Sequence, residues 1–195
     1  RFGERIYQDS TLNPMTTVAG QIKSKGIGGP GSPDIAWQSD VYIFDRDTSI
    51  WYQPEFTFHT YRYMEISGLK YQPKLNDING LALSSNVING NNFSCSSDLI
   101  NSIQHATRRT FLSNLQSVQT DCAAREKFGY GGDLNATSEA FIYNFDMQSF
   151  YRKTIYDWID AINDTVFVDT APYVGIEYCG ISWESAFLTT QHYLY

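Results

Sequence analysis

The chain has 195 residues, 42% hydrophobic and 18% charged, which is typical of a globular protein long enough to bury a sizeable core. Its formal net charge is -7, from 14 Lys and Arg against 21 Asp and Glu, so nucleic acid is excluded as the expected partner. A neutral ligand suits this negative charge better than a phosphate-rich one. Aromatic residues make up 15% of the chain, and their rings suit the faces of pyranose sugars, although most are expected in the core and in sheets.

No targeting sequence or membrane span is recognisable. No apolar run approaches the roughly 18–20 residues of a membrane-spanning helix, and the first residues lack both an initiator Met and a signal-peptide pattern. The chain starts in a strand-like segment and stops within a helical pattern, which predicts a piece of a longer protein. The compartment stays open, with a periplasmic or extracellular location favoured over a cytoplasmic one, and the oligomeric state is unknown.

Strand and turn signals dominate residues 1–70. Short strands are predicted at 41–44 and 50–52, and a long strand at 56–66, where aromatic residues alternate with other residues at period two. The stretch 26–31 matches the dinucleotide-binding pattern Gly-x-Gly-x-x-Gly, but no helix pattern follows it. We therefore interpret it as a loop.

Helix signals dominate the second half of the chain. Residues 71–92 are rich in Asn, Gly and Pro and are interpreted as a connection. Ser97 is the predicted N-cap of a helix that ends just before residue 121, and Asp133 and Asp146 are the predicted caps of two more. A further helix is predicted from near Glu184 to the end of the chain.

Helices that follow strands, rather than alternating with them, indicate an α+β fold and not a parallel βαβ sheet. The expected domains are a β domain at 1–70, the connection at 71–92 and a helical domain at 93–195.

The most informative stretch is 121–133, Asp-Cys-Ala-Ala-Arg-Glu-Lys-Phe-Gly-Tyr-Gly-Gly-Asp. It brings three carboxylates and a guanidinium close together in sequence, and a folded loop would point Asp121, Arg125, Glu126 and Asp133 into one cavity. We expect its glycines to allow the folding by taking positive φ. The alternative is a solvated, charged turn between helices.

This stretch resembles the Asp-Cys-(Pro)-x-Arg-Glu-Lys-x-Gly-(Trp)-x-Gly-Asp signature of the bacterial α-L-rhamnosidases, family 78 of the glycoside hydrolases. Three further stretches resemble the same family in the same order: Phe-Thr-Phe-His-Thr-Tyr-Arg-Tyr-Met-Glu-Ile-Ser-Gly at 56–68, Phe-Ser-Cys-Ser at 93–96, and Ser-Trp-Glu-Ser-Ala at 182–186. The chain departs from the family pattern at Ala123, where Pro is usual, at Ser185, near a usual Asp, and at Tyr130, where Trp is usual.

The resemblance implies the end of a β-sandwich that leads into the first helices of an (α/α)6 six-hairpin toroid. It also implies an inverting glycosidase acting on a rhamnose-containing oligosaccharide or glycoside, without a cofactor or metal. Glu126 would be the general acid. Asp121, Arg125 and Asp133 would hold rhamnose hydroxyls, and Trp183 would wall the sugar ring.

The chemistry of the residues agrees with these roles. Glycoside hydrolysis uses one carboxylic acid to protonate the leaving oxygen and one carboxylate to activate water or to attack. Asp121 and Asp133 would favour the protonated form of Glu126 by like-charge repulsion, whereas Arg125 would oppose it if it lay closer. For Trp183, packing between helices remains an equal alternative.

The second carboxylate is not recognisable in this chain. In the family the general base is a glutamate further along, and neither Glu177 nor Glu184 lies in a stretch that resembles its surroundings. Two functions therefore remain open: a rhamnosidase that releases terminal rhamnose from plant-type glycosides or polysaccharides, and a non-catalytic carbohydrate-binding relative that keeps the pocket but lacks the base.

Other chemistries are less well supported. A Cys122 nucleophile with His105 or His192 would need a pairing that the sequence does not indicate, and Cys122 stands where the motif has a structural Cys. The three histidines are dispersed and form no zinc pattern. Asn-x-Ser/Thr sequons occur at Asn92, Asn135 and Asn163, but Asn135 is so close to Asp133 that we expect no glycan there.

Overall fold

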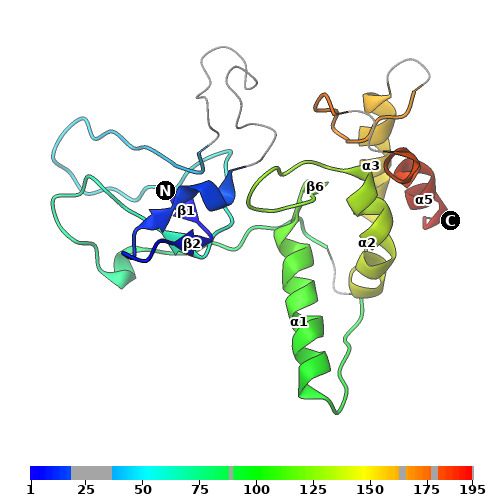
Figure 1. Cartoon of the computed structure of the whole chain (residues 1–195), viewed down its shortest axis with the longest axis horizontal. Helices are drawn as coiled ribbons and strands as arrows, with labels where there is room; N and C mark the ends of the chain where they lie inside the picture. Colours follow the sequence, from blue (N-terminus) through cyan, green and yellow to red (C-terminus); the bar gives the residue numbers. More distant parts are fainter. Residues whose placement is uncertain (19–36, 88–89, 163–165, 177–179, 195) are drawn as a thin grey trace. The chain divides into compact units, whose positions relative to one another are not determined.

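The computed structural model describes residues 1–18, 37–87, 90–162, 166–176 and 180–194 (Figure 1). The chain forms two compact units. Unit 1 comprises Arg1–Ala82 and Ala123–Glu126, and unit 2 comprises Leu83–Cys122 and Lys127–Tyr195. The predicted loop at 26–31, the sequon at Asn163 and the late Glu177 lie outside the described residues.

Unit 1 holds short antiparallel strand pairs. β1 (Phe2–Gly3) pairs with β4 (Tyr63–Met64), and β2 (Arg5–Ile6) pairs with β3 (Leu12–Asn13). Its described residues also form the 3-10 helices η1 (Pro14–Thr17), directly after β3, and η2 (Leu75–Asp77), after β4. The antiparallel pairing agrees with the sequence, because the alternating run at 56–66 supplies the strand that pairs with the start of the chain.

The extent of the predicted strands in unit 1 is wrong. Residues 41–44 and 50–52 form no strand, and only Tyr63–Met64 of the run at 56–66 is in a ladder. An alternating pattern shows that residues suit a pleated surface, but a strand also needs a neighbour to accept its hydrogen bonds. Without one among the described residues, Val41, Ile43 and Trp51 are 80%, 84% and 83% exposed.

Unit 2 begins with the helix that the sequence predicts best. α1 (Asp98–Ser113) has Ser97 as its N-cap, and the Ser97 side chain accepts a hydrogen bond from the backbone N–H of Ile100. The predicted N-cap is confirmed, but the helix ends at Ser113 and not just before residue 121. A tight hairpin of β5 (Leu115–Gln116) and β6 (Val118–Gln119) follows, with Ser117 at φ 65° in its turn.

The later helices form, but their ends differ from the predicted ones. α2 (Gly131–Asn144) has Tyr130 as its N-cap, so Asp133 lies inside its first turn. α3 (Gln148–Ala161) has Met147 as its N-cap, although Asp146 still accepts a hydrogen bond from the N–H of Gln148. The predicted cap at Asp133 is therefore three residues too late, and the one at Asp146 is one residue too early. Asp133 suits its place inside the first helical turn, because the helix dipole attracts negative charge there.

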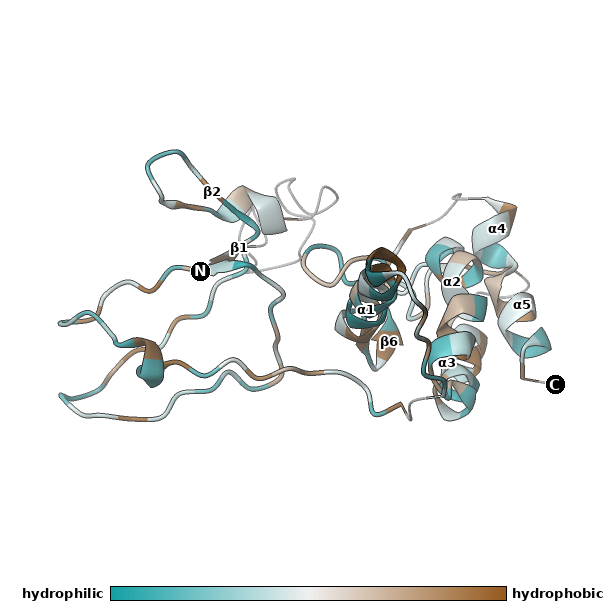
Figure 2. Ribbon diagram, turned by 90° about the horizontal axis from the view of Figure 1, so that it is seen from below, coloured by the Kyte–Doolittle hydropathy of each residue, from teal (hydrophilic) through white to brown (hydrophobic). Residues whose placement is uncertain are grey.

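The last predicted helix is divided. α4 (Ile181–Glu184) starts before Glu184, and α5 (Ala186–His192) ends before the described part of the chain does. α5 packs against both α2 and α3, as Figure 2 shows.

The hydrophobic core of unit 2 lies among these helices and includes Phe145, Tyr151 and Trp158, each at most 1% exposed. No described helix is both long and apolar enough to cross a membrane. Strand pairs in the first part and helices in the second confirm the α+β class, and α2 contributes Leu134 and Phe141 to the core of unit 2.

Candidate functional site

The stretch singled out by its charges is a loop between β6 and α2. The backbone N–H of Asp121 donates to the carbonyl oxygen of Phe128 (3.0 Å), and the Asp121 carboxylate accepts a hydrogen bond from the N–H of Phe128 (3.1 Å). These two bonds close the loop at its ends. Asp121 therefore shapes the loop itself, a role that the sequence did not indicate.

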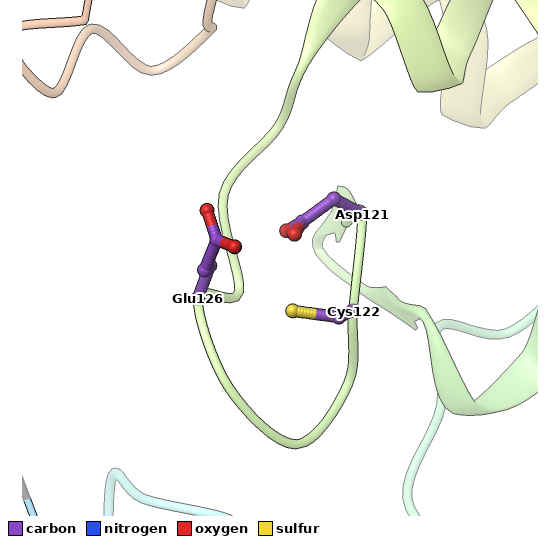
Figure 3. Close-up of side chains that lie close together, drawn as sticks. All are labelled: Asp121, Cys122 and Glu126. Atoms are coloured by element: carbon purple, nitrogen blue, oxygen red, sulfur yellow. The ribbon is translucent and has the colours of Figure 1, made fainter. Parts of the chain in front are cut away.

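Within this closed loop, three side chains from its two arms point toward one another, as Figure 3 shows. One carboxylate oxygen of Asp121, the Sγ atom of Cys122 and one carboxylate oxygen of Glu126 all lie within 4.8 Å of one another. All three residues are half-buried. The local fold thus places the proposed acid, Glu126, beside the carboxylate of Asp121, as the sequence predicts for these two residues.

Carboxylates and a thiol are also atom types that bind divalent cations. A structural zinc site needs four protein ligands, and the described residues bring only three together here. Proximity alone does not identify a metal site, since acidic groups often lie close to one another without an ion.

Arg125 is held by a different part of unit 1. Its Nε donates to the carbonyl oxygen of Thr16 (3.0 Å), and its Nη2 lies 3.3 Å from the carboxylate of Glu4. Neither contact was expected from the sequence, because both partners are more than a hundred positions away. Arg125 keeps half of its side chain exposed.

The glycines of the motif work differently from the prediction. Gly129, Gly131 and Gly132 are not among the glycines with positive φ; within the loop that conformation belongs to Lys127, at φ 60°. The lack of a side chain at these glycines instead allows other segments of the chain to approach their backbone closely. A Cβ on Gly129 would collide with the carbonyl oxygen of Ala171, and a Cβ on Gly131 with that of Trp183.

Trp183 belongs to α4 and packs against the first turn of α2. A Cβ on Gly132 would stand only 2.7 Å from Cδ2 and Cζ2 of its indole ring, so the ring sits directly over this glycine. The side-chain amide of Asn135 donates to the carbonyl oxygen of Ser182 (3.2 Å), which ties α4 to α2 a second time. Trp183 is half-buried, and it packs beside the residue that precedes Asp133.

Asp133 is supported from the core through its backbone. Its carbonyl oxygen accepts a hydrogen bond from Thr137 Oγ1 (2.6 Å), which in turn accepts one from Gln119 Nε2 (2.8 Å). The buried hydroxyl of Tyr151 donates to Gln119 Oε1 (3.1 Å). Burial raises the pKa of Tyr151, so this hydroxyl keeps the proton that it donates.

One segment beside the motif was missed by the sequence reasoning. Gly131 N–H donates to the carbonyl oxygen of Asp169 (2.8 Å), and Ala171 N–H donates to that of Gly129 (3.0 Å), so the backbone around Thr170 runs antiparallel to the start of α2. Asp169 is only 2% exposed. The signal that was available is the run Phe-Val-Asp-Thr-Ala-Pro at 167–172, in which a carboxylate stands among apolar residues.

Comparison with known families agrees with this division of the chain. Residues 89–195 match the family described as bacterial alpha-L-rhamnosidase 6 hairpin glycosidase domain. Residues 1–84 match the bacterial alpha-L-rhamnosidase concanavalin-like domain.

Individual relatives point the same way. An alpha-L-rhamnosidase of Formosa agariphila is 33% identical over 68% of this chain, and one of Streptomyces avermitilis is 29% identical over 98% of it. The solved structure of an alpha-L-rhamnosidase from Dictyoglumus thermophilum is 33% identical and superposes with a TM-score of 0.75 over the whole chain. The structure of the Streptomyces avermitilis enzyme complexed with L-rhamnose, at 23% identity and a TM-score of 0.72, supports the fold alone.

The chain is much shorter than these relatives. It spans 14% and 18% of the two curated sequences, and 20% of the Dictyoglumus structure.

Proposed function

Because this chain belongs to the bacterial α-L-rhamnosidase family, we propose that the protein containing it is an inverting glycoside hydrolase. Its substrate is a plant-type glycoside or polysaccharide that ends in α-L-rhamnose. The observation that carries the proposal is the match of residues 89–195 to the six-hairpin glycosidase domain, because that span includes the charged loop with Glu126.

Glu126 acts as the general acid. Its protonated carboxyl group gives a proton to the glycosidic oxygen while the bond from this oxygen to the anomeric carbon breaks. The Asp121 carboxylate lies beside Glu126, within the 4.8 Å cluster.

A water molecule attacks the anomeric carbon from the opposite face and loses a proton to a second carboxylate, the general base. An inverting enzyme holds its two carboxyl groups about 6.5–9.5 Å apart to leave room for that water. The pair of Asp121 and Glu126 is closer than this, so Asp121 is not the base. We assign the base to a glutamate outside residues 1–195.

The remaining predicted residues bind the sugar. Asp121, Arg125 and Asp133 hold rhamnose hydroxyls, and Trp183 walls the ring. Trp183 packs against Gly132, the neighbour of Asp133 in the first turn of α2. Asp121 and Arg125 contact Phe128 and Glu4. The domain limits of 1–70, 71–92 and 93–195 remain part of this proposal.

The test uses the full-length protein and a nitrophenyl α-L-rhamnoside. Release of nitrophenol shows hydrolysis, and proton NMR of the fresh product shows the anomer. An inverting enzyme produces β-L-rhamnose first, which then mutarotates. Initial α-L-rhamnose would overturn the inverting mechanism, and L-rhamnose binding without any hydrolysis would instead identify a carbohydrate-binding relative.

A further inference from the structure

The glycine pair at the start of α2 does more than permit a turn. We propose that Gly132 and Asn135 are positioning residues that fix Trp183 against α2 and thereby set where the rhamnose ring lies. This inference rests on the proposed function, because it takes Trp183 and Asp133 as parts of the sugar site. It concerns residues of unit 2 alone.

The first step is the fit between ring and glycine. Three neighbouring atoms of the indole, Cδ2, Cε2 and Cζ2, are the atoms that a Cβ on Gly132 would meet first. Two of them would be at 2.7 Å, well inside the roughly 3.5–4.0 Å of an ordinary carbon contact. Any side chain at position 132 therefore has to displace the indole of Trp183.

The second step is that α4 needs contacts with neighbouring elements to hold its position. It is a four-residue helix, Ile181–Glu184, and a single turn has little stability of its own. α2 fixes it at three points: the ring over Gly132, the Trp183 backbone against Gly131, and the hydrogen bond from Asn135 to Ser182. α4 also runs through Ser185 into α5, and the contacts with α2 fix the Trp183 ring against the first turn of that helix.

The third step links this contact to the ligand. Asp133 lies between Gly132 and Asn135 in the sequence, inside the same helical turn, so the carboxylate and the aromatic ring are attached to one rigid element. A hydroxyl held by Asp133 and a sugar face held by Trp183 then keep a constant spacing. Displacing a positioned group by about 1 Å can cost about a hundredfold in rate.

The experiment is a double-mutant cycle in the full-length protein, measured on a nitrophenyl α-L-rhamnoside and by L-rhamnose binding. Gly132→Ala should raise KM and weaken L-rhamnose binding about tenfold or more, with a smaller effect on kcat. In a Trp183→Ala background the same change should have almost no effect, because the ring that it displaces is gone. Gly80→Ala, at a glycine with nothing within 4 Å of its Cβ position, should behave like the unmodified protein.

Asn135→Asp provides a second route that adds no bulk. It keeps the shape of the side chain but removes the donor to Ser182, so KM should rise about threefold to tenfold and the rise should again vanish with Trp183→Ala. Equal penalties with and without Trp183 would overturn the proposal, even if Gly132→Ala itself failed to fold. A protein that hydrolyses no rhamnoside would instead contradict the proposed function, and a Trp183→Ala variant with unchanged KM would contradict the sugar-wall role of Trp183.

Discussion

At the scale of single residues, Glu126 carries the proposed proton transfer. Glu126→Gln keeps the size of the side chain but removes the transferable proton. General acid catalysis typically accelerates a reaction about a hundredfold to ten-thousandfold. The kcat should therefore fall by this factor for a natural rhamnoside with a sugar-alcohol leaving group. A nitrophenyl leaving group needs little protonation, so that substrate should be affected far less. The measurement is kcat on both substrates.

Asp133→Asn is the matched control for this prediction. A residue that holds a hydroxyl acts on the rhamnose common to both substrates, so both should weaken by the same factor. If Glu126→Gln also left the ratio between the two substrates unchanged, Glu126 would not be the acid.

Gly129 allows a second prediction at this scale, on stability. Alanine at this position would meet the carbonyl oxygen of Ala171 and Cγ1 of Val118, the latter at 2.7 Å. Overpacking of this kind usually costs about 1–3 kcal/mol, so Gly129→Ala should lower the free energy of unfolding in urea by that amount. Gly80→Ala has open space and should not be destabilised, because it only restricts the unfolded chain. Equal stability of the two variants would show that the contact with Ala171 is absent.

At the scale of elements, the N-cap of α1 should contribute measurably to stability. None of its residues is fully buried, and Ser97 satisfies the N–H of Ile100 at its first turn. Replacing an N-cap serine by alanine typically costs about 1 kcal/mol. Ser97→Ala should therefore reduce stability by about that much in urea unfolding, whereas Ser96→Ala, at the exposed residue just before it, should not. A larger loss for Ser96→Ala would mean that the cap has been assigned to the wrong serine.

The helices also show what the sequence can predict. Their apolar spacing repeats within each segment, so α1, α2 and α3 follow from local pattern, whereas the caps at Asp133 and Asp146 and the end of α1 are displaced. Strands depend on a partner that is distant in sequence. The run at 56–66 therefore predicts a strand correctly at Tyr63–Met64 but cannot show how far the pairing extends.

The same distinction applies to the site. The charged motif identifies Glu126 and Asp121 because both lie in one short loop, and the structure places them together. The contact of Arg125 with Glu4 and that of Gly129 with Ala171 join positions far apart in the chain, so no local pattern reveals them. The sequence also predicts a role for the glycines of the motif, but through positive φ, whereas in the structure they allow close packing.

At the scale of the whole molecule, the buried apolar residues are distributed unevenly. The core cluster, from Leu115 to Phe187, belongs entirely to unit 2. The buried apolar residues of unit 1 are few among those that the structure describes: Leu12, Val18, Ala123 and Ala124. Apolar burial is the dominant favourable contribution to folding, so the two units should differ in local stability.

Native-state hydrogen exchange should show this difference directly. The slowest amides should lie in α2 and α3, which contribute Leu134, Phe141, Tyr151 and Trp158 to the core, whereas amides at 41–52 should exchange rapidly because no ladder protects them. Leu134→Ala removes a side chain that is 3% exposed, and such core truncations cost about 2–5 kcal/mol, so protection in α2 and α3 should fall by that amount. Leu75→Ala, at a side chain 86% exposed, should change none of these rates. Slow exchange at 41–52 equal to that of α2 would contradict the assignment of the stable core to the helices, and would mean that those residues pair as the strands that their sequence pattern predicts.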